Sequence, residues 1–296
     1  MKPDTSPAAQ IRDTVADRKT MLDVLIALVP ALIASIVIFG LRALLVSLVC
    51  VAVAVLSEFI FQKIVKRPVT VGDFSAVITG LLLAFCLPVN IPLWVAGLGS
   101  VVAIVVAKQL FGGFGYNFAN PAITARVILL ISFGIEMTSN TLDGISSATP
   151  LAGANPGLLS LFLGNHAGSL GETCTLALLI GGIWLLIRKV ISWQIPVAFL
   201  ATVAVISLIT GQDALVQLMG GGLVLGAVFM ATDPTTSPVS GLGKIIYGVG
   251  CGLLTMMVRL LGSTPEGVSY AILLMNILTP HIDKIRVGKS AGGEAA

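Results

Sequence analysis

The chain has 296 residues, of which 56% are hydrophobic and only 10% are charged, and its formal net charge at pH 7 is +3. A soluble domain carries about 25% charged residues, so this composition excludes a water-soluble globular protein. The small positive excess also excludes an extended basic surface, so we expect the lipid bilayer as a partner and not nucleic acid.

The hydrophobic residues form blocks of about 17 to 25 residues, the length that a helix needs to cross about 30 Å of hydrocarbon. The blocks lie at residues 21–40, 42–62, 74–90, 92–111, 121–134, 172–190, 194–211, 215–232, 242–262 and 267–281. The block at 121–134 is short and contains Arg126, which favours a tilted or broken helix against protein neighbours. The sequence predicts an all-α integral membrane protein with about ten transmembrane helices.

Lysine and arginine residues in the short loops predict the orientation, because positively charged loops stay on the cytoplasmic side. With ten helices, most of these residues fall on one face together with the polar segments 1–20 and 282–296, although Arg42 and Arg259 do not fit. Residues 135–171 form the longest loop and contain no lysine or arginine, so we expect them outside. We therefore expect a multi-pass protein of the inner cell membrane, with its first segment retained and both termini in the cytoplasm.

The two halves of the chain resemble each other. Three stretches match, 80–88 with 222–230, 97–99 with 241–243, and 108–113 with 259–263. Because each half holds five blocks, residues 172–281 would enter the membrane from the side opposite to residues 21–134. We expect two inverted five-helix repeats, an arrangement that places binding sites where the repeats meet.

Residues 143–150 in the outer loop combine an acid, small residues and hydroxyl groups. An extended, accessible peptide of this composition suits recognition by a modifying enzyme. The same residues are typical of a turn, because Asp and Ser bond their own backbone, Gly tolerates positive φ and Pro fixes the exit. Residue chemistry alone favours the turn.

Residues 111–122 lie in a predicted cytoplasmic loop and are rich in glycine and aromatic residues. The glycines permit close approach of a ligand, Phe118 and its aromatic neighbours can stack on a flat ring, and Asn117 and Asn120 can pair with the polar edge of that ring. The alternative is a helix-capping turn in which Asn120 and Pro121 open the fifth helix. The residues alone do not decide between these interpretations.

Residues 232–238 follow the eighth block and contain Asp233 with several hydroxyl groups. These oxygens can contribute to a ligand site or bind a cation. An Asp-Pro turn that closes the helix explains the same residues, and one carboxylate alone does not predict an ion site.

The three segments also carry a resemblance to a known family. Residues 143–149 read Asp-Gly-Ile-Ser-Ser-Ala-Thr and resemble the acceptor motif on which ApbE-type flavin transferases place FMN through a phosphoester bond to Thr, although Gly often stands where this chain has Ser147. Residues 112–122 and 229–238 resemble signature segments of the NqrB/RnfD family. One member is the RnfD subunit of the Rnf ion-translocating electron-transport complex. The other is the NqrB subunit of the sodium-pumping NADH:quinone oxidoreductase, which has an extended amino terminus that this sequence lacks, so the Rnf member is favoured.

This resemblance implies two flavin cofactors. The first is FMN on Thr149 in the outer loop, with a recognition motif formed by Asp143, Ser146, Ser147 and Ala148. The second is a noncovalent riboflavin toward the cytoplasm, in an environment that we expect to include Asn117, Phe118, Asn120, Arg126 and Asp233. A cation such as Arg126 near a flavin would favour the reduced, anionic form of the ring.

The implied function is that of a membrane subunit in an Rnf-type ferredoxin:NAD+ oxidoreductase complex, which passes electrons between the two flavins while the complex moves Na+ or H+. The implied partners are the other Rnf subunits and an ApbE-type transferase. Ferredoxin and NAD+ would bind elsewhere, because this sequence has no cysteine cluster and no G-x-G-x-x-G fingerprint, and we predict neither a complete active site nor a metal site in it. The alternatives are a solute channel or transporter built from inverted repeats, with Thr149 unmodified, and a structural scaffold for partner subunits.

Overall fold

The computed structural model describes residues 14–139, 141–142, 145–146, 151, 157–262 and 267–290, and this part of the chain is almost entirely helical. The first half contains α1 (Thr14–Phe39), α2 (Leu41–Ile64), η1 (Val71–Asp73), α3 (Ser75–Phe85), α4 (Leu93–Val101), η2 (Val102–Gln109), α5 (Pro121–Ser132) and α6 (Gly134–Thr138). A short antiparallel hairpin follows, formed by β1 (Thr141–Leu142) and β2 (Ile145–Ser146). The second half contains α7 (Leu158–Leu163), α8 (Thr175–Ile187), α9 (Gln194–Ile209), α10 (Ala214–Met219), α11 (Leu223–Leu225), η4 (Gly226–Met230), α12 (Gly241–Leu261) and α13 (Gly267–Ser290).

Each predicted apolar block contains a helix, but two blocks are more interrupted than expected. α3 ends at Phe85, although its block is predicted to run to residue 90. The block at 215–232 is divided into α10, α11 and η4. Among the described residues, three helices are long and apolar enough to cross a membrane, namely α1 from Arg18 onward, α2 and α12, and five shorter apolar helices accompany them.

The outer faces of the long helices are apolar. On α1, Ala27 and Ala31 are buried against the protein. The opposite face of the same helix exposes large side chains along its length, namely Leu22, Ile26, Val29, Ile33 and Val37. Exposed apolar surface of this extent marks contact with a membrane, and helices satisfy their own backbone there. The chain is therefore a helical membrane protein.

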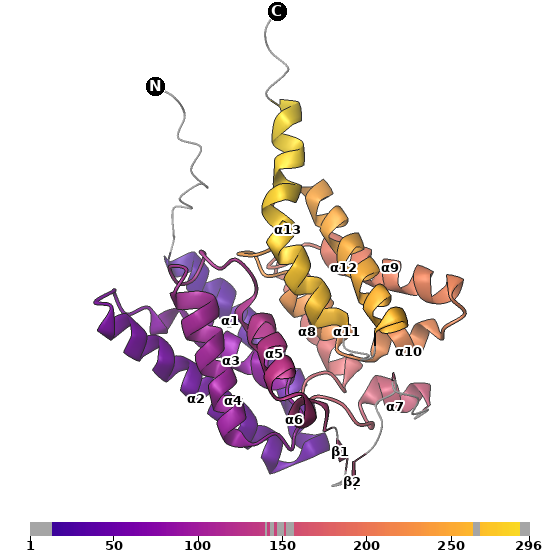
Figure 1. Ribbon diagram of the computed structural model, residues 1–296, viewed down its shortest axis with the longest axis horizontal. Coiled ribbons are helices and arrows are strands. Elements are labelled where there is room, and N and C mark those ends of the chain that lie inside the picture. The colour runs from indigo at the N-terminus through magenta and orange to yellow at the C-terminus, as the bar shows by residue number, and fades with distance from the viewer. Residues whose placement is uncertain are drawn as a thin grey trace, which may run out of the picture.

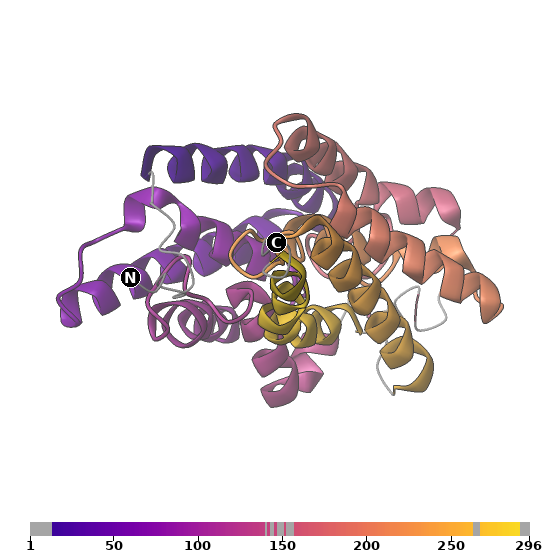
Figure 2. The same cartoon turned by 90° about the horizontal axis from the view of Figure 1, so that it is seen from above.

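The helices of the two halves form two groups that lie side by side (Figure 1), as the view from above also shows (Figure 2). The groups share an internal contact, because α2 packs on α4 and α9 packs on α12. The first helices of the two halves, α1 and α8, pack on each other, and so do the last helices, α5 and α13. Counterparts in the two halves thus meet across the boundary between them.

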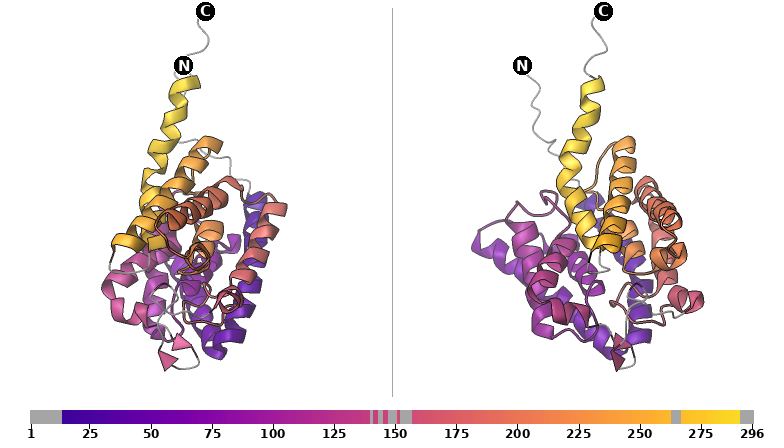
Figure 3. Two further views of the ribbon diagram at one scale, coloured as in Figure 1. Left: turned by 90° about the vertical axis from the view of Figure 1, so that its right-hand side faces the viewer. Right: turned by 45° about the vertical axis from the view of Figure 1, so that its right-hand side comes forward.

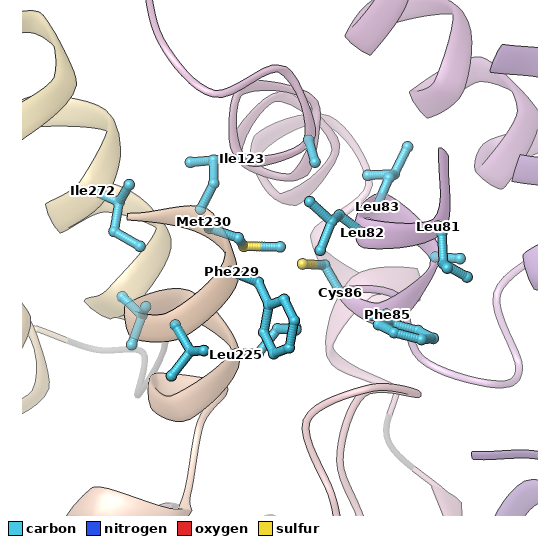
Figure 4. Packing of buried hydrophobic residues seen from close by; sticks show 14 of the residues in the cluster. Leu81, Leu82, Leu83, Phe85, Cys86, Ile123, Leu225, Phe229, Met230 and Ile272 are labelled. Carbon is cyan, nitrogen blue, oxygen red and sulfur yellow. The ribbon is translucent and has the colours of Figure 1, made fainter. Parts of the chain in front are cut away.

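The third helical segments of the two halves, α3 and η4, lie near the centre, where Phe229 and Met230 of η4 point toward Leu82 of α3 (Figure 4). α3 is buried on nearly all faces, and every residue of η4 is buried. Gly80 permits close approach of α3 to α2, because a Cβ at this position would lie 2.8 Å from the carbonyl oxygen of Cys50. Protein, and not lipid, surrounds these two segments.

Arg42 and Arg259, the two exceptions to the predicted charge pattern, bind carbonyl groups where the third segments are interrupted. Arg42 donates from Nε to the carbonyl oxygen of Val89 at 3.3 Å, just after α3. Arg259 donates to the carbonyl oxygens of Gln217 and Gly220 at 2.6 and 3.0 Å, just before α11. Carbonyl groups outside a regular helix need such donors at membrane depth. Local hydrogen bonding therefore explains the positions of both arginine residues.

The molecule has two distinct ends. α13 projects beyond the other helices at the end where α1 begins, and the β1–β2 hairpin lies at the opposite end (Figure 3). We name them the terminal end and the hairpin end.

Candidate functional site

A cavity lies at the terminal end, between the two halves of the molecule. It is formed by the beginnings of α1, α3 and α5, the end of η2, and the segments after α8 and η4, and it encloses about 710 Å³, part of it open to solvent. Ligand cavities in proteins span roughly 300 to 1,000 Å³. The apolar wall includes Met21, Ile78, Leu82, Phe114, Ile191 and Phe229. The polar wall consists of Thr20, Ser75, Thr79, Lys108, Asn117, Asn120, Thr232 and Asp233.

Asn120 connects the two halves at this cavity. Its side-chain oxygen accepts hydrogen bonds from the backbone N–H groups of Ala122 at 3.0 Å and Ile123 at 3.3 Å, so it caps α5. Its Nδ2 lies 3.4 Å from the carbonyl oxygen of Met230 and 3.5 Å from Oδ2 of Asp233. The helix-capping interpretation is therefore confirmed, and the same residue lines the cavity.

Asn117 presents an unpaired acceptor in the cavity wall. Its side-chain oxygen is buried and has no hydrogen-bond partner among the described residues. A buried polar atom left in this state costs about 1–3 kcal/mol. A ligand that donates a hydrogen bond to Asn117 would remove this cost.

Asp233 opens the turn after η4. Its Oδ1 accepts hydrogen bonds from the backbone N–H and the hydroxyl of Thr235, at 3.1 and 2.9 Å, which confirms the predicted turn. Burial raises the pKa of this carboxyl, whereas the hydrogen bonds from Thr235 and the charge of Lys108 act in the opposite direction. The same residue therefore closes η4 and contributes a carboxyl to the cavity.

Lys108 lies in η2, a π-helical turn in which the N–H of Leu110 bonds the carbonyl oxygen of Val105 at 3.0 Å. Such turns recur at functional sites, and they rotate the side chains that follow around the helix axis. The Nζ of Lys108 donates to both carboxylate oxygens of Glu58, at 3.0 and 2.9 Å, and to Oγ of Ser75 at 2.7 Å. The side chains of Lys108 and Glu58 are 1% and 0% exposed, so the cavity wall contains a fully buried ion pair.

Phe118 and Arg126, two of the residues expected near riboflavin, lie away from the cavity. Phe118 is 39% exposed, and its ring packs on Phe111 with a centroid distance of 4.7 Å. α5 runs without a break through Arg126, whose Nη1 lies 2.5 Å from Oε1 of Glu172. A buried guanidinium requires such a partner, because an isolated buried charge costs several kcal/mol. Arg126 therefore forms a structural ion pair in this fold.

The structure thus brings together Asn117, Asn120 and Asp233, from two segments that are far apart in the sequence. The sequence analysis does not predict Lys108 or Ser75 as wall residues. A charged residue inside an apolar block is the available signal for Lys108, and Ser75 carries none beyond its hydroxyl group.

The residues expected to accept FMN lie around β2. Thr149, Asp143, Ser147 and Ala148 lie outside the described residues, whereas Ser146 forms part of β2. Leu151 contacts the turn before α11, because a Cβ on Gly221 would lie 2.5 Å from Cδ1 of Leu151.

The described part of the cavity suits an organic ligand with a flat apolar body and a polar edge. Aromatic and aliphatic side chains form most of its wall, and amide, hydroxyl and charged groups gather on one part of it. No group of three or more His, Cys, Asp or Glu side chains that could bind a metal ion occurs within the described residues.

Comparison with known proteins gives a match to the family model described as NQR2, RnfD, RnfE, over residues 4–292. The chain is 48% identical over 292 residues to the subunit named D of the Na+-translocating ferredoxin:NAD+ oxidoreductase complex of Acetobacterium woodii, and the match covers 94% of this chain and 92% of that protein. It is 40% identical to the subunit of the same letter in the proton-translocating ferredoxin:NAD+ oxidoreductase complex of Clostridium ljungdahlii, over 95% of this chain and 92% of that protein. It is also 38% identical to the corresponding subunit of the ion-translocating oxidoreductase complex of Stutzerimonas stutzeri, over 94% and 92% of the two chains.

These relationships extend over almost the whole chain and agree with its helical membrane fold. The chain belongs to the NQR2, RnfD, RnfE family.

Proposed function

We propose that the chain is the RnfD subunit of an Rnf-type ion-translocating ferredoxin:NAD+ oxidoreductase complex, and that it transfers electrons across the membrane between two flavins. The observation that carries this proposal is the convergence of Asn117, Asn120 and Asp233 in one cavity, in a chain 48% identical to a subunit of such a complex. The other subunits of the complex are then its protein partners. Movement of Na+ or H+ is a property of the assembled complex.

The proposed membrane arrangement has about ten transmembrane helices in two inverted repeats, residues 21–134 and 172–281, with residues 135–171 outside the cell membrane. Contacts between counterparts support it, because α1 meets α8, α5 meets α13, and α3 faces η4. Two repeats related by a twofold axis in the membrane plane are expected to meet in this way. The terminal end, with segments 1–20 and 282–296, then faces the cytoplasm.

A matching pair of polar contacts supports the same arrangement. Lys108, late in the fourth helical segment of the first half, donates to Ser75 at the start of the third segment. Arg259, late in α12, donates at 3.0 Å to Oε1 of Gln217, just before the third segment of the second half. The sequence match of 108–113 with 259–263 aligns these two cations.

Riboflavin fits the cavity at the terminal end. The oxygen of Asn117 can accept a hydrogen bond from a ring N–H, and Nδ2 of Asn120, whose protein partners are at 3.4 and 3.5 Å, can donate to a ring carbonyl oxygen. Phe114 and Phe229 supply aromatic surface for the ring and exclude water from it. When bound, the isoalloxazine supplies the redox chemistry by holding one or two electrons.

The proposed outer carrier is FMN, joined by a phosphoester bond to Thr149 by an ApbE-type transferase. The motif formed by Asp143, Ser146, Ser147 and Ala148 supports this assignment. A covalent bond prevents loss of a cofactor that faces external solvent. Thr149 is then an attachment point and not a nucleophile in turnover.

We test the covalent site with Thr149→Ala. Wild-type and variant chains are produced with an active flavin transferase, denatured, and examined by intact mass and in-gel flavin fluorescence. We expect an adduct of FMN mass on the wild type and none on Thr149→Ala, with equal membrane insertion, because one loop hydroxyl contributes little to helix packing.

Thr141→Ala is the matched control, since it removes another loop hydroxyl outside the motif and should keep the adduct. An unmodified wild-type chain beside an active transferase would contradict the proposal and favour a solute transporter or a scaffold.

A further inference from the structure

Lys108 is the one cationic side chain among the described residues that line the cavity. Its partner Glu58 does not line the cavity, whereas Ser75, which accepts a hydrogen bond from the same Nζ, does. The ammonium group therefore lies on the cavity side of the ion pair, with the carboxylate behind it.

A dense hydrogen-bond network fixes this ammonium group in place. Besides Lys108, Oε1 of Glu58 accepts hydrogen bonds from Nε2 of Gln109 at 2.8 Å and Nε2 of Gln62 at 3.2 Å. Gln62 in turn donates to Oγ1 of Thr70 at 2.8 Å. Lys108 cannot turn away without leaving a buried carboxylate unpaired, which is strongly unfavourable.

The other charged groups near the cavity do not replace Lys108. Asp233 is the only carboxyl among the described lining residues, and its charge has the opposite sign. Arg126, the cation that the sequence favours for this role, is paired with Glu172 away from the cavity. The positive charge that a ligand meets here comes from Lys108.

We propose that Lys108 makes this cavity bind reduced flavin more tightly than oxidised flavin, and so sets the reduction potential of the flavin held there. The inference rests on the proposed function. Reduction adds two electrons and one proton to the neutral ring and gives an anion of charge −1, with the electrons supplied by the electron-donating subunit of the complex. A fixed cation in a poorly solvated site stabilises this anion and gives the neutral ring no comparable gain.

The test measures the affinity of the purified full-length chain, produced without a flavin transferase, for riboflavin in its oxidised and dithionite-reduced forms. The quantity compared is the ratio of the two dissociation constants, oxidised over reduced. The variant is Glu58→Gln with Lys108→Gln, which removes both charges and leaves no buried carboxylate unpaired. Lys108→Arg keeps the charge, and Lys63→Gln removes an exposed cation from the same end of the molecule.

We expect wild-type chain to bind the reduced form at least tenfold more tightly. The double variant should lower the ratio about tenfold, equivalent to about 30 mV for a two-electron couple. Lys108→Arg and Lys63→Gln should keep the wild-type ratio.

Three results would overturn the inference. In the first, wild-type chain prefers the oxidised form, a result that does not depend on whether the double variant folds. In the second, the double variant loses affinity for both forms equally, as a purely structural residue would. In the third, wild-type chain binds neither form, which would also remove the cavity from the proposed function, whereas the first two leave that cavity assignment intact.

Discussion

Asn120 uses its two side-chain atoms for different purposes. The oxygen caps α5, and the nitrogen lies near Met230 and Asp233 from the other half of the chain. A helix cap contributes about 1 kcal/mol to stability. Asn120 therefore places the first turn of α5, and the cavity wall that this turn forms, relative to η4.

Asn120→Ala should lower the occupancy of noncovalent riboflavin and leave covalent FMN on Thr149 unchanged. The variant loses both the cap of α5 and the amide that faces the cavity. Flavin released from the denatured, purified chain measures the first quantity, and protein-bound fluorescence measures the second.

Ser240→Ala is the control for loss of a cap. Oγ of Ser240 accepts a hydrogen bond from the N–H of Gly243 at 3.0 Å and caps α12, and Ser240 does not line the cavity. It should lower the melting temperature about as much as Asn120→Ala and keep riboflavin. Full riboflavin occupancy in Asn120→Ala would show that the flavin binds elsewhere.

Several residues of the cavity could be predicted from the sequence, because polar, glycine-rich segments interrupt apolar blocks at Asn117, Asn120 and Asp233. The sequence could not show which way neighbouring side chains face. Arg126 turns toward Glu172, 46 residues away. Lys108 joins the wall through Glu58, 50 residues away.

α3 has 11 residues, which gives a length of about 16 Å, about half of the roughly 30 Å thickness of the hydrocarbon layer. The segment can be this short because protein surrounds it and Arg42 bonds the chain that follows it. Ser75 and Thr79, at the beginning of α3, line the cavity. The polar site can therefore reach into the membrane region without contact with lipid.

Gly80→Ala should destabilise the protein and weaken riboflavin binding. The new Cβ would lie 2.8 Å from backbone atoms of Cys50 and Val51, so α3 must move away from α2 and carry its cavity residues with it. Overpacking of this kind costs about 1–3 kcal/mol. Thermal melting and riboflavin titration measure the two effects.

Gly97→Ala supplies the comparison within α4. Its Cβ would lie at an ordinary 3.7 Å from Val53, and alanine is intrinsically better than glycine in a helix by about 1 kcal/mol. We expect unchanged or higher stability for Gly97→Ala. Equal melting temperatures for the two variants would show that α2 and α3 do not pack as closely as described.

The sequence predicts where helices occur, because hydropathy reports the apolar blocks well. It does not predict the end of α3 at Phe85, the division around α11 or the π-helical turn η2. Hydropathy cannot distinguish an apolar residue that faces lipid from one that faces protein. Interruptions are tolerated where protein neighbours such as Arg42 and Arg259 satisfy the freed carbonyl groups.

The molecule as a whole presents apolar side chains outward and holds its polar groups in two places, the cavity and the ion pair of Arg126 with Glu172. The cavity lies at the terminal end, and the β1–β2 hairpin lies at the other. A carrier in the cavity and a second carrier in the loop around β2 would therefore stand on opposite sides of the membrane. This separation is what electron transfer across a membrane requires.

The flavin content of the purified wild-type chain, produced with an active transferase, tests this function most directly. Denaturation and filtration separate flavin that is released from flavin that stays on the protein, and both are identified by mass. We predict one releasable riboflavin and one covalent FMN per chain. A chain that carries neither flavin would contradict the proposal that it is an electron carrier.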